Sequence, residues 1–178
     1  MTGMKSMLRC AVLLAAVWTV ALAGSAQEMA HHEPSSPSTE LIVRGLDGKA
    51  ITLSPADLAA MPHKTVAVMN HHTNANESYS GVALSDLLAK VGAPQGSDVK
   101  GKLFMLGVVV TGTDKYSVLF AIAETDPTIH TGDILVADQM NGQKLDKYGA
   151  FKLVSTEEKR PARWVRNLSS ISLVEVKP

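Results

Sequence analysis

Cysteine is nearly absent from this 178-residue sequence, which contains one, Cys10. A single cysteine cannot close a disulfide within the chain, and Cys10 lies at the start of an N-terminal apolar run. Once that run is removed, as argued next, no thiolate remains for catalysis or metal ligation. Burial and hydrogen bonding must then hold the fold together without covalent cross-links.

The sequence also lacks an apolar run long enough to span a membrane. Lys5 and Arg9 precede an apolar stretch over 10–23 and small residues over 24–26, which is the layout of a secretory signal peptide. Because the stretch is shorter than the roughly 20 residues that cross a bilayer, we expect cleavage rather than anchoring. We therefore predict a signal peptide over 1–26, a periplasmic or secreted protein, and no membrane partner after cleavage.

Long blocks of like charge are absent as well. Loss of Lys5 and Arg9 leaves 15 basic and 17 acidic residues, so we expect no nucleic-acid partner. Residues 27–39 are polar, contain two prolines and have no hydrophobic period, which predicts a disordered leader. Residues 40–178 then form one domain of ordinary size.

The patterns along this domain predict many short strands and two helices. One helix begins at Ser54, a favoured N-cap residue followed by proline, and ends near Met61. The other is capped by Ser85 and buries a stripe of four apolar residues, Leu84, Leu87, Leu88 and Val91. Strands are predicted over 40–44, 50–53, 64–69, 104–110, 116–121, 134–137, 151–154 and 171–176, with a hairpin turn at Asn141 and Gly142. Without regular βαβ alternation, this order favours a mixed α+β fold.

Several segments occur in an order that resembles a known family. They are 53–58 (LSPADL), 79–88 (YSGVALSDLL), 114–116 (DKY), 140–145 (MNGQKL), 148–154 (YGAFKLV) and 164–165 (WV). In this order they resemble the sulfite-oxidase-like molybdopterin-binding domain, over roughly three quarters of the chain. The resemblance implies the mixed α+β sheet fold of that domain, and molybdopterin as the cofactor.

Catalytic members of the family hold an oxo-molybdenum centre through two pterin sulfurs and one protein cysteine, and they move an oxygen atom or an electron pair. The resemblance places the counterpart of that cysteine near Asn70 or His71, and neither is a thiol. Imidazole and thiolate donate very differently to a metal, so the family's chemistry does not transfer directly.

Two sets of residues are predicted to bind a ligand. Asn70, His71 and His72 lie in the loop that resembles the active-site loop, and His71 is the candidate metal ligand. The alternative is an exposed polar loop. Arg160, Arg163 and Arg166 could bind the phosphate of a pterin through forked guanidinium contacts. The alternative is a solvated basic face, and Trp164 beside it is expected to pack with its indole N–H satisfied locally.

We therefore predict an exported single-domain protein that binds a pterin-like or small anionic ligand, with doubtful redox activity because the cysteine ligand is missing. Two alternatives stay open. One is an active molybdopterin-dependent oxidoreductase with a non-cysteine metal site. The other is a non-catalytic module that binds a metal or another protein, suggested by His31, His32, His71 and His72. The sequence identifies neither a substrate nor a redox partner.

Overall fold

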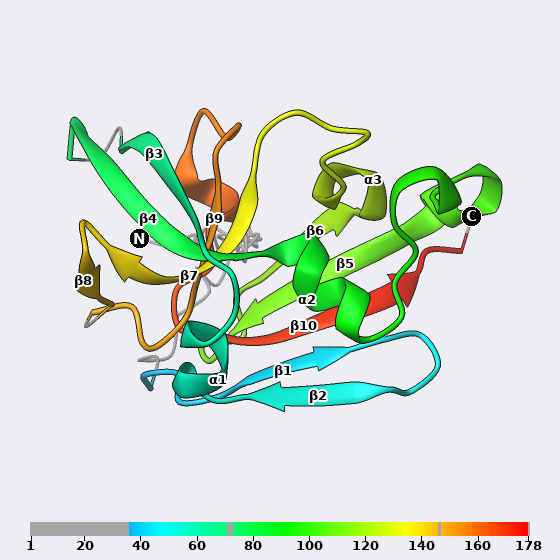
Figure 1. The fold of residues 1–178 in the computed structure, drawn as a ribbon, viewed down its shortest axis with the longest axis horizontal. Helices are drawn as coiled ribbons and strands as arrows, with labels where there is room; N and C mark the ends of the chain where they lie inside the picture. Colours follow the sequence, from blue (N-terminus) through cyan, green and yellow to red (C-terminus); the bar gives the residue numbers. More distant parts are fainter. Residues whose placement is uncertain (1–35, 71–72, 146, 178) are drawn as a thin grey trace, which may run out of the picture. The chain divides into compact units, whose positions relative to one another are not determined.

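The computed structural model describes residues 36–70, 73–145 and 147–177. The predicted signal peptide and residues 27–35 of the predicted leader lie outside this range. Within it, the chain forms two five-stranded sheets and a few short helices, so the predicted α+β class is confirmed (Figure 1).

The first sheet has the strand order β2-β1-β10-β5-β6. Its strands are β1 (Leu41–Arg44), β2 (Ala50–Leu53), β5 (Leu106–Gly112), β6 (Ser117–Ala121) and β10 (Leu168–Glu175). β1 and β10 run parallel, with Ile42 opposite Ser170, and the other pairs are antiparallel. The pairing of β1 with β10 joins the start of the domain to its end.

The second sheet is built around β7. Its strands are β3 (Lys64–Asn70), β4 (Ala75–Ala83), β7 (Ile134–Met140), β8 (Gln143–Lys144) and β9 (Lys152–Ser155). β7 pairs antiparallel with β4, β8 and β9, and β3 pairs with β4. The predicted turn at Asn141 and Gly142 is confirmed, because both residues have the positive φ, 52° and 76°, that a tight hairpin requires.

Three short α-helices lie in the described part of the chain. In α1 (Pro55–Ala59) the Ser54 side chain and Asp57 form the reciprocal bonds of a capping box, as the sequence predicted for its start. α2 (Leu84–Lys90) buries its predicted apolar stripe, but Ser85 does not cap it. The helix begins at Leu84, one residue before Ser85, because the chain passes directly from the end of β4 at Ala83 into the helix. α3 is Ile122–Thr125.

The predicted strand over 104–110 begins too early. Residues Gly101–Met105 form a short 3₁₀ helix, which leaves Phe104 48% exposed, and β5 starts at Leu106. Two further 3₁₀ turns are Gly96–Asp98 and Pro161–Arg163. The apolar run therefore contains a turn and a strand, which composition alone does not separate.

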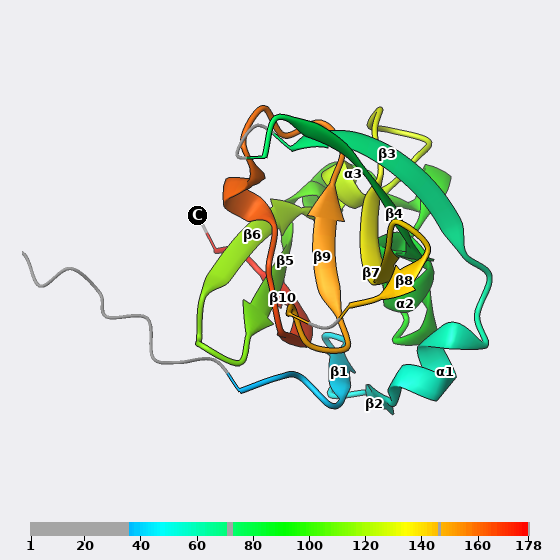
Figure 2. The same ribbon diagram turned by 90° about the vertical axis from the view of Figure 1, so that its left-hand side faces the viewer.

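Two hydrophobic clusters hold the domain together. The larger gathers the inner faces of both sheets and α2, through Val43, Val110 and Ile171 from one sheet, Val82, Val136 and Leu153 from the other, and Leu84, Leu87 and Leu88 from the helix. Figure 2 shows β5, β6 and β10 on one side and β4, β7 and β9 on the other. The smaller cluster covers the opposite face of the second sheet and includes Tyr79, Leu135, Val154 and Trp164.

The last residues of the predicted leader contact the domain. Ser38 is 4% exposed, and its carbonyl accepts a hydrogen bond of 3.1 Å from the Ala150 N–H. The carbonyl of Ser36 accepts one of 2.7 Å from Thr113. The packed domain therefore extends back to at least residue 36.

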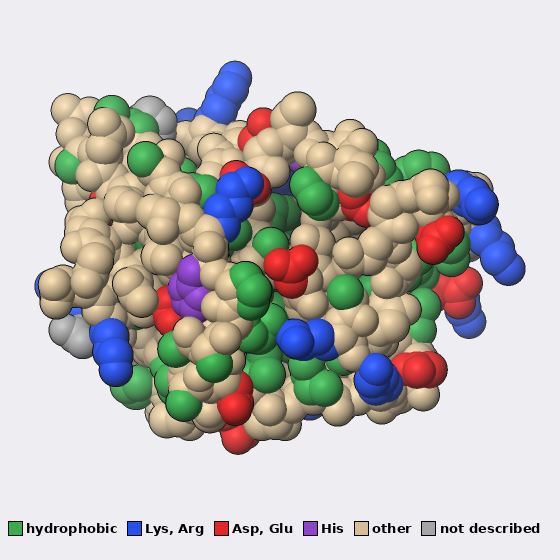
Figure 3. Space-filling view, viewed as in Figure 1, with side chains coloured by type: hydrophobic (Ala, Val, Ile, Leu, Met, Phe, Trp, Pro, Cys, Tyr) green, Lys and Arg blue, Asp and Glu red, His purple; other side chains and the backbone are tan. Residues whose placement is uncertain are grey.

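None of the helices described in the structure is long and apolar enough to cross a bilayer. On the face shown in Figure 3, basic and acidic side chains lie interspersed.

Candidate functional site

A buried lysine on the second sheet is surrounded by aromatic rings. Lys152 in β9 is 5% exposed, and its ammonium lies 4.3 Å from the ring centre of Tyr79, 4.4 Å from that of Tyr148 and 5.0 Å from that of Trp164. Tyr79 and Trp164 also meet edge to face, with ring centres 5.6 Å apart. The negative faces of such rings attract a cation, so they offset part of the cost of burying it.

A chain of polar groups leads from this lysine to the end of β3. The Lys152 ammonium donates a hydrogen bond of 2.6 Å to the Tyr79 hydroxyl, which donates one of 2.7 Å to Oε2 of Glu77. Oε1 of Glu77 accepts a bond of 2.8 Å from the Asn70 amide. The carboxylate therefore reaches the buried ammonium through one phenol. We call the groups of Lys152, Tyr79, Tyr148, Trp164 and Glu77 the Lys152 site.

Strand periodicity explains why these side chains meet. Side chains two residues apart on a strand share a face, so Glu77 and Tyr79 of β4 point the same way, as do Lys152 and Val154 of β9. Leu153, between the latter two, packs into the larger cluster on the other face. The predicted packing role of Trp164 is confirmed, because its indole N–H donates 2.8 Å to the Ser155 carbonyl.

Burial and neighbouring charges change the acidity of both polar groups. Burial lowers the pKa of Lys152 from 10.5 to about 8; the negative charge of Glu77 opposes this shift and the positive charge of Arg166 adds to it. Burial and the nearby Glu77 carboxylate raise the pKa of Tyr79 well above its usual 10. A buried lysine whose pKa is lowered toward neutrality, beside a phenol hydrogen-bonded to a carboxylate, marks a candidate functional site.

The predicted active-site loop is described in part. Asn70 is half-buried at the end of β3 and directs its amide to Glu77, so it belongs to the edge of the Lys152 site. His71 and His72 lie outside the described residues. Their predicted roles in binding a cofactor, and that of His71 as a metal ligand, stay predictions.

The three predicted phosphate-binding arginines have different surroundings. Arg163 donates from Nε to Glu158 at 2.7 Å and from Nη1 to Glu124 at 3.0 Å, and its guanidinium lies 4.3 Å from the Phe120 ring. Through these two ion pairs Arg163 joins α3, which contains Glu124, to the segment after β9, which contains Glu158. Its predicted contact with a pterin phosphate stays a prediction. Arg160 and Arg166 are exposed, and the charge of Arg166 acts on Lys152.

Sequence reasoning missed Lys152 as the centre of the site. A signal was present, because Lys152 stands between Phe151 and Leu153 in a strand whose neighbours are apolar, and lysine is rarely fully buried without a partner. The partners, however, come from distant segments at Glu77, Tyr79 and Trp164. Their approach could not be inferred from spacing along the chain.

Asn70 is the one described residue of the pair at which the resemblance places the metal-binding thiolate. Asn70 offers a neutral amide that already donates to Glu77, whereas the family's molybdenum takes a soft thiolate. Within residues 36–70, 73–145 and 147–177, no group of three or more histidine, cysteine, aspartate or glutamate side chains is placed to hold a metal ion.

Comparison with known proteins shows a likeness of fold. No protein-family model matches the sequence, and no curated protein matches it. Among solved structures, the chain is similar to the sulfane dehydrogenase SoxCD from Paracoccus pantotrophus, with a TM-score of 0.57 and 19% sequence identity. The match covers 75% of this chain and 37% of that chain, so this chain spans well under half of the neighbour's length.

Proposed function

We propose that this protein is an exported single-domain binding protein with the fold of the sulfite-oxidase-like molybdopterin-binding domain. It binds a small anionic, pterin-like ligand at the Lys152 site and carries out no redox step through a protein-bound metal. The fold likeness to a sulfane dehydrogenase supports the fold, and the ordered segments that resemble the sulfite-oxidase-like domain support the pterin-like ligand.

The buried ammonium of Lys152 is the observation that carries this proposal. The charges that act on it in the described part of the chain are those of Arg166, which is positive, and Glu77, which is negative. Two cations therefore stand against one carboxylate, and an anion bound beside half-buried Tyr148 and exposed Arg166 would balance the excess. Aromatic faces at the same place suit a flat ring such as a pterin.

The absence of redox chemistry follows from the donor set. The resemblance places the metal-binding thiolate near Asn70 or His71, neither of which is a thiol, and the chain after residue 26 contains no cysteine. The pterin could still bind through its phosphate and ring, because those contacts need cations and aromatic faces rather than sulfur. Binding is then the role that the remaining residues support.

Elemental and pterin analysis of the protein exported by its native host tests the redox half of the proposal. We expect no stoichiometric molybdenum or tungsten. A metal at one equivalent per chain would overturn this half and favour an active oxidoreductase.

Titration with 6-hydroxymethylpterin phosphate tests the binding half. Calorimetry should detect binding to the wild type, a loss of at least about tenfold in Lys152→Met, and a smaller loss in Lys152→Arg, which keeps the charge. Lys159→Met is the matched control, since Lys159 is an exposed lysine outside the Lys152 site. Equal affinities of wild type and Lys152→Met would remove the Lys152 site from the proposal.

A further inference from the structure

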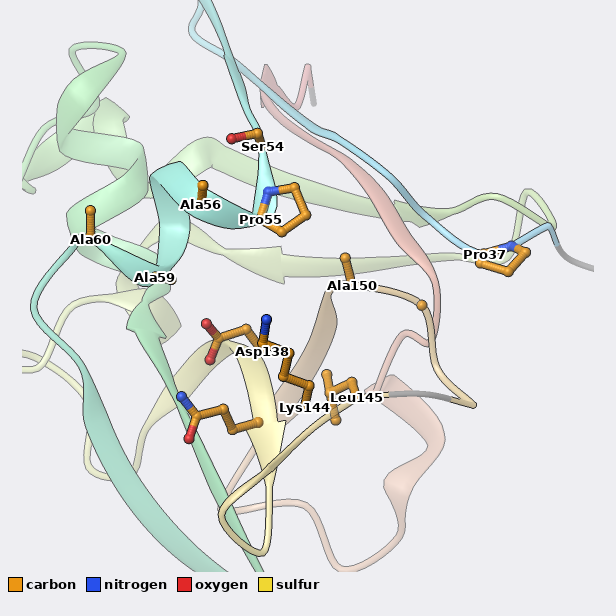
Figure 4. Close-up of a pocket in the computed structure, with 12 residues that line it drawn as sticks. Pro37, Ser54, Pro55, Ala56, Ala59, Ala60, Asp138, Lys144, Leu145 and Ala150 are labelled. Carbon is orange, nitrogen blue, oxygen red and sulfur yellow. The ribbon is translucent and has the colours of Figure 1, made fainter.

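A concave site elsewhere in the domain has none of the residues of the Lys152 site in its lining. A cleft of about 990 Å³ opens between α1 and the β7–β8 hairpin, a volume in the range of small-molecule sites. Figure 4 shows α1 on one side of it, with Asp138 and Lys144 opposite and Pro37 and Ala150 at one end.

Small apolar side chains form most of the cleft. α1 contributes Pro55, Ala56, Ala59 and Ala60, and the other segments add Pro37, Leu145 and Ala150. Alanine and proline reach a short way from the backbone, so the space between the helix and the hairpin stays unfilled by the chain's own side chains. An apolar ligand body would bury surface against them.

A β-bulge directs a carboxylate into this apolar space. Ser80 pairs with Gln139 and Gly81 with Ala137, so Asp138 is an extra residue between two consecutive pairs. Bulges of this kind turn a side chain away from the regular direction of the strand. The Asp138 side chain is 11% exposed and lines the cleft.

His63 holds this carboxylate from one side. Nε2 of His63 lies 3.1 Å from Oδ1 of Asp138, and Nδ1 donates a bond of 2.7 Å to the Met61 carbonyl. The imidazole is therefore fixed at both nitrogens and fixes Oδ1 in turn. Among the described residues, no hydrogen bond is made to Oδ2.

We propose that this cleft binds a small organic cation, an apolar body that carries an ammonium group. The ammonium contacts Oδ2 of Asp138, and the body packs against the prolines and alanines of the wall. A carboxylate in mostly apolar surroundings repels an anion and gains from a second charge-assisted donor. The cation of the lining, Lys144, is exposed and can turn its ammonium to solvent.

Three probes of one shape and different charge test this inference in the full-length protein. They are benzylammonium, benzyl alcohol and benzoate, measured by calorimetry at the same pH and salt. We expect benzylammonium to bind about tenfold more tightly than benzyl alcohol, and benzoate to bind most weakly. Preference for benzoate would overturn the proposal.

Three substitutions place the binding in the cleft. Asp138→Asn keeps the side-chain shape and should abolish the preference for benzylammonium over benzyl alcohol. Ala59→Leu fills the cleft from α1 and should weaken both probes at least about fivefold, because it removes space rather than charge. Lys144→Met should leave benzylammonium binding equal or tighter. Unchanged benzylammonium affinity in Asp138→Asn would sink the assignment.

A measurement on the wild type guards against a folding defect in Asp138→Asn. Nuclear Overhauser effects between the benzylammonium ring and the methyl groups of Ala59 and Ala150 are expected. Contacts to other methyl groups with none to these two would contradict the site. This outcome does not depend on the Lys152 site, so the two proposals fail separately.

Discussion

The ammonium of Lys152 donates a 2.6 Å hydrogen bond to the hydroxyl of Tyr79, and the two residues come from strands 73 positions apart in the sequence. β4 and β9 both pair with β7, so the central strand brings these side chains onto one face. Burying a cation in this way costs stability unless its partners offset the lost hydration. That cost gives the first prediction.

Replacing Lys152 with methionine is expected to stabilise the protein at pH 7 by about 1 kcal/mol, because an apolar chain of similar length needs no desolvation. Urea unfolding measures the change. The free energy of unfolding of Lys159→Met should stay within about 0.5 kcal/mol of the wild type, because Lys159 is exposed. A Lys152→Met protein that is less stable than the wild type by about 2 kcal/mol or more would mean that the Lys152 site binds the ammonium more strongly than water does.

Stability should also depend on pH in a direction set by the same lysine. Between pH 8 and 10.5 the native lysine, with a pKa of about 8, loses its proton while the unfolded one keeps it. The unfolded state then binds more protons, so the free energy of unfolding rises with pH, by about 3 kcal/mol at most. Above pH 10 the raised pKa of Tyr79 acts oppositely, because tyrosine ionises in the unfolded chain first.

The rise from pH 8 to pH 10 should be absent in Lys152→Met, and urea titrations at both values compare the two proteins. Parallel pH profiles for wild type and variant would show that other groups cause the rise.

Removing the phenol between Lys152 and Glu77 should destabilise the protein. Tyr79→Phe leaves the ammonium without its acceptor and Oε2 of Glu77 without its donor, at about 1–3 kcal/mol. Tyr148→Phe is the matched control, since it keeps the ring that faces the ammonium and should change stability by less than about 0.5 kcal/mol. Thermal or urea unfolding measures the stability of both variants. Equal losses in Tyr79→Phe and Tyr148→Phe would refute the hydrogen bonds from Lys152 through Tyr79 to Glu77 as the cause of the destabilisation.

Gly149 is a position where a side chain should not fit. Its φ is +70°, and a Cβ there would lie 2.4 Å from Oδ1 of Asn167 and 2.5 Å from Oγ of Ser38. Gly149→Ala should therefore cost about 2–4 kcal/mol. Gly142→Ala, with φ +76° and nothing within 4 Å of the added carbon, isolates the backbone term at about 1 kcal/mol. Similar losses of stability in both variants would show that the contacts of the added carbon with Asn167 and Ser38 contribute nothing to the effect.

Substitutions of Arg163 and Arg166 are expected to have different effects, one on stability and the other on ligand binding. Arg163→Met breaks the contacts with Glu124 and Glu158 and should cost about 1 kcal/mol, discounted because the side chain is 36% exposed. It should leave pterin phosphate affinity unchanged. Arg166→Met should keep stability and lower that affinity about threefold to tenfold, since its charge acts at the Lys152 site. The reverse pattern in calorimetry and urea unfolding would refute this division.

Much of the fold could be predicted because its signals are local. The capping box at Ser54, the apolar stripe of α2 and the turn at Asn141 and Gly142 each depend on residues within a few positions. The errors were also local. Ser85 is a favoured N-cap residue, yet it does not cap α2. Phe104 lies in a 3₁₀ turn that composition does not distinguish from the strand that follows it.

By itself, the sequence determined the secondary structure class, the hairpin turn at Asn141 and Gly142 and the absence of a thiolate from the chain after residue 26. These properties follow from residue type and short-range order. The tertiary structure decided which charged groups meet. It places Lys152 beside Tyr79 and Glu77, pairs Arg163 with two carboxylates, and directs the side chain of Asp138 into a cleft. Those contacts join segments tens of residues apart, and strand pairing in three dimensions, rather than spacing along the chain, sets the distances between them.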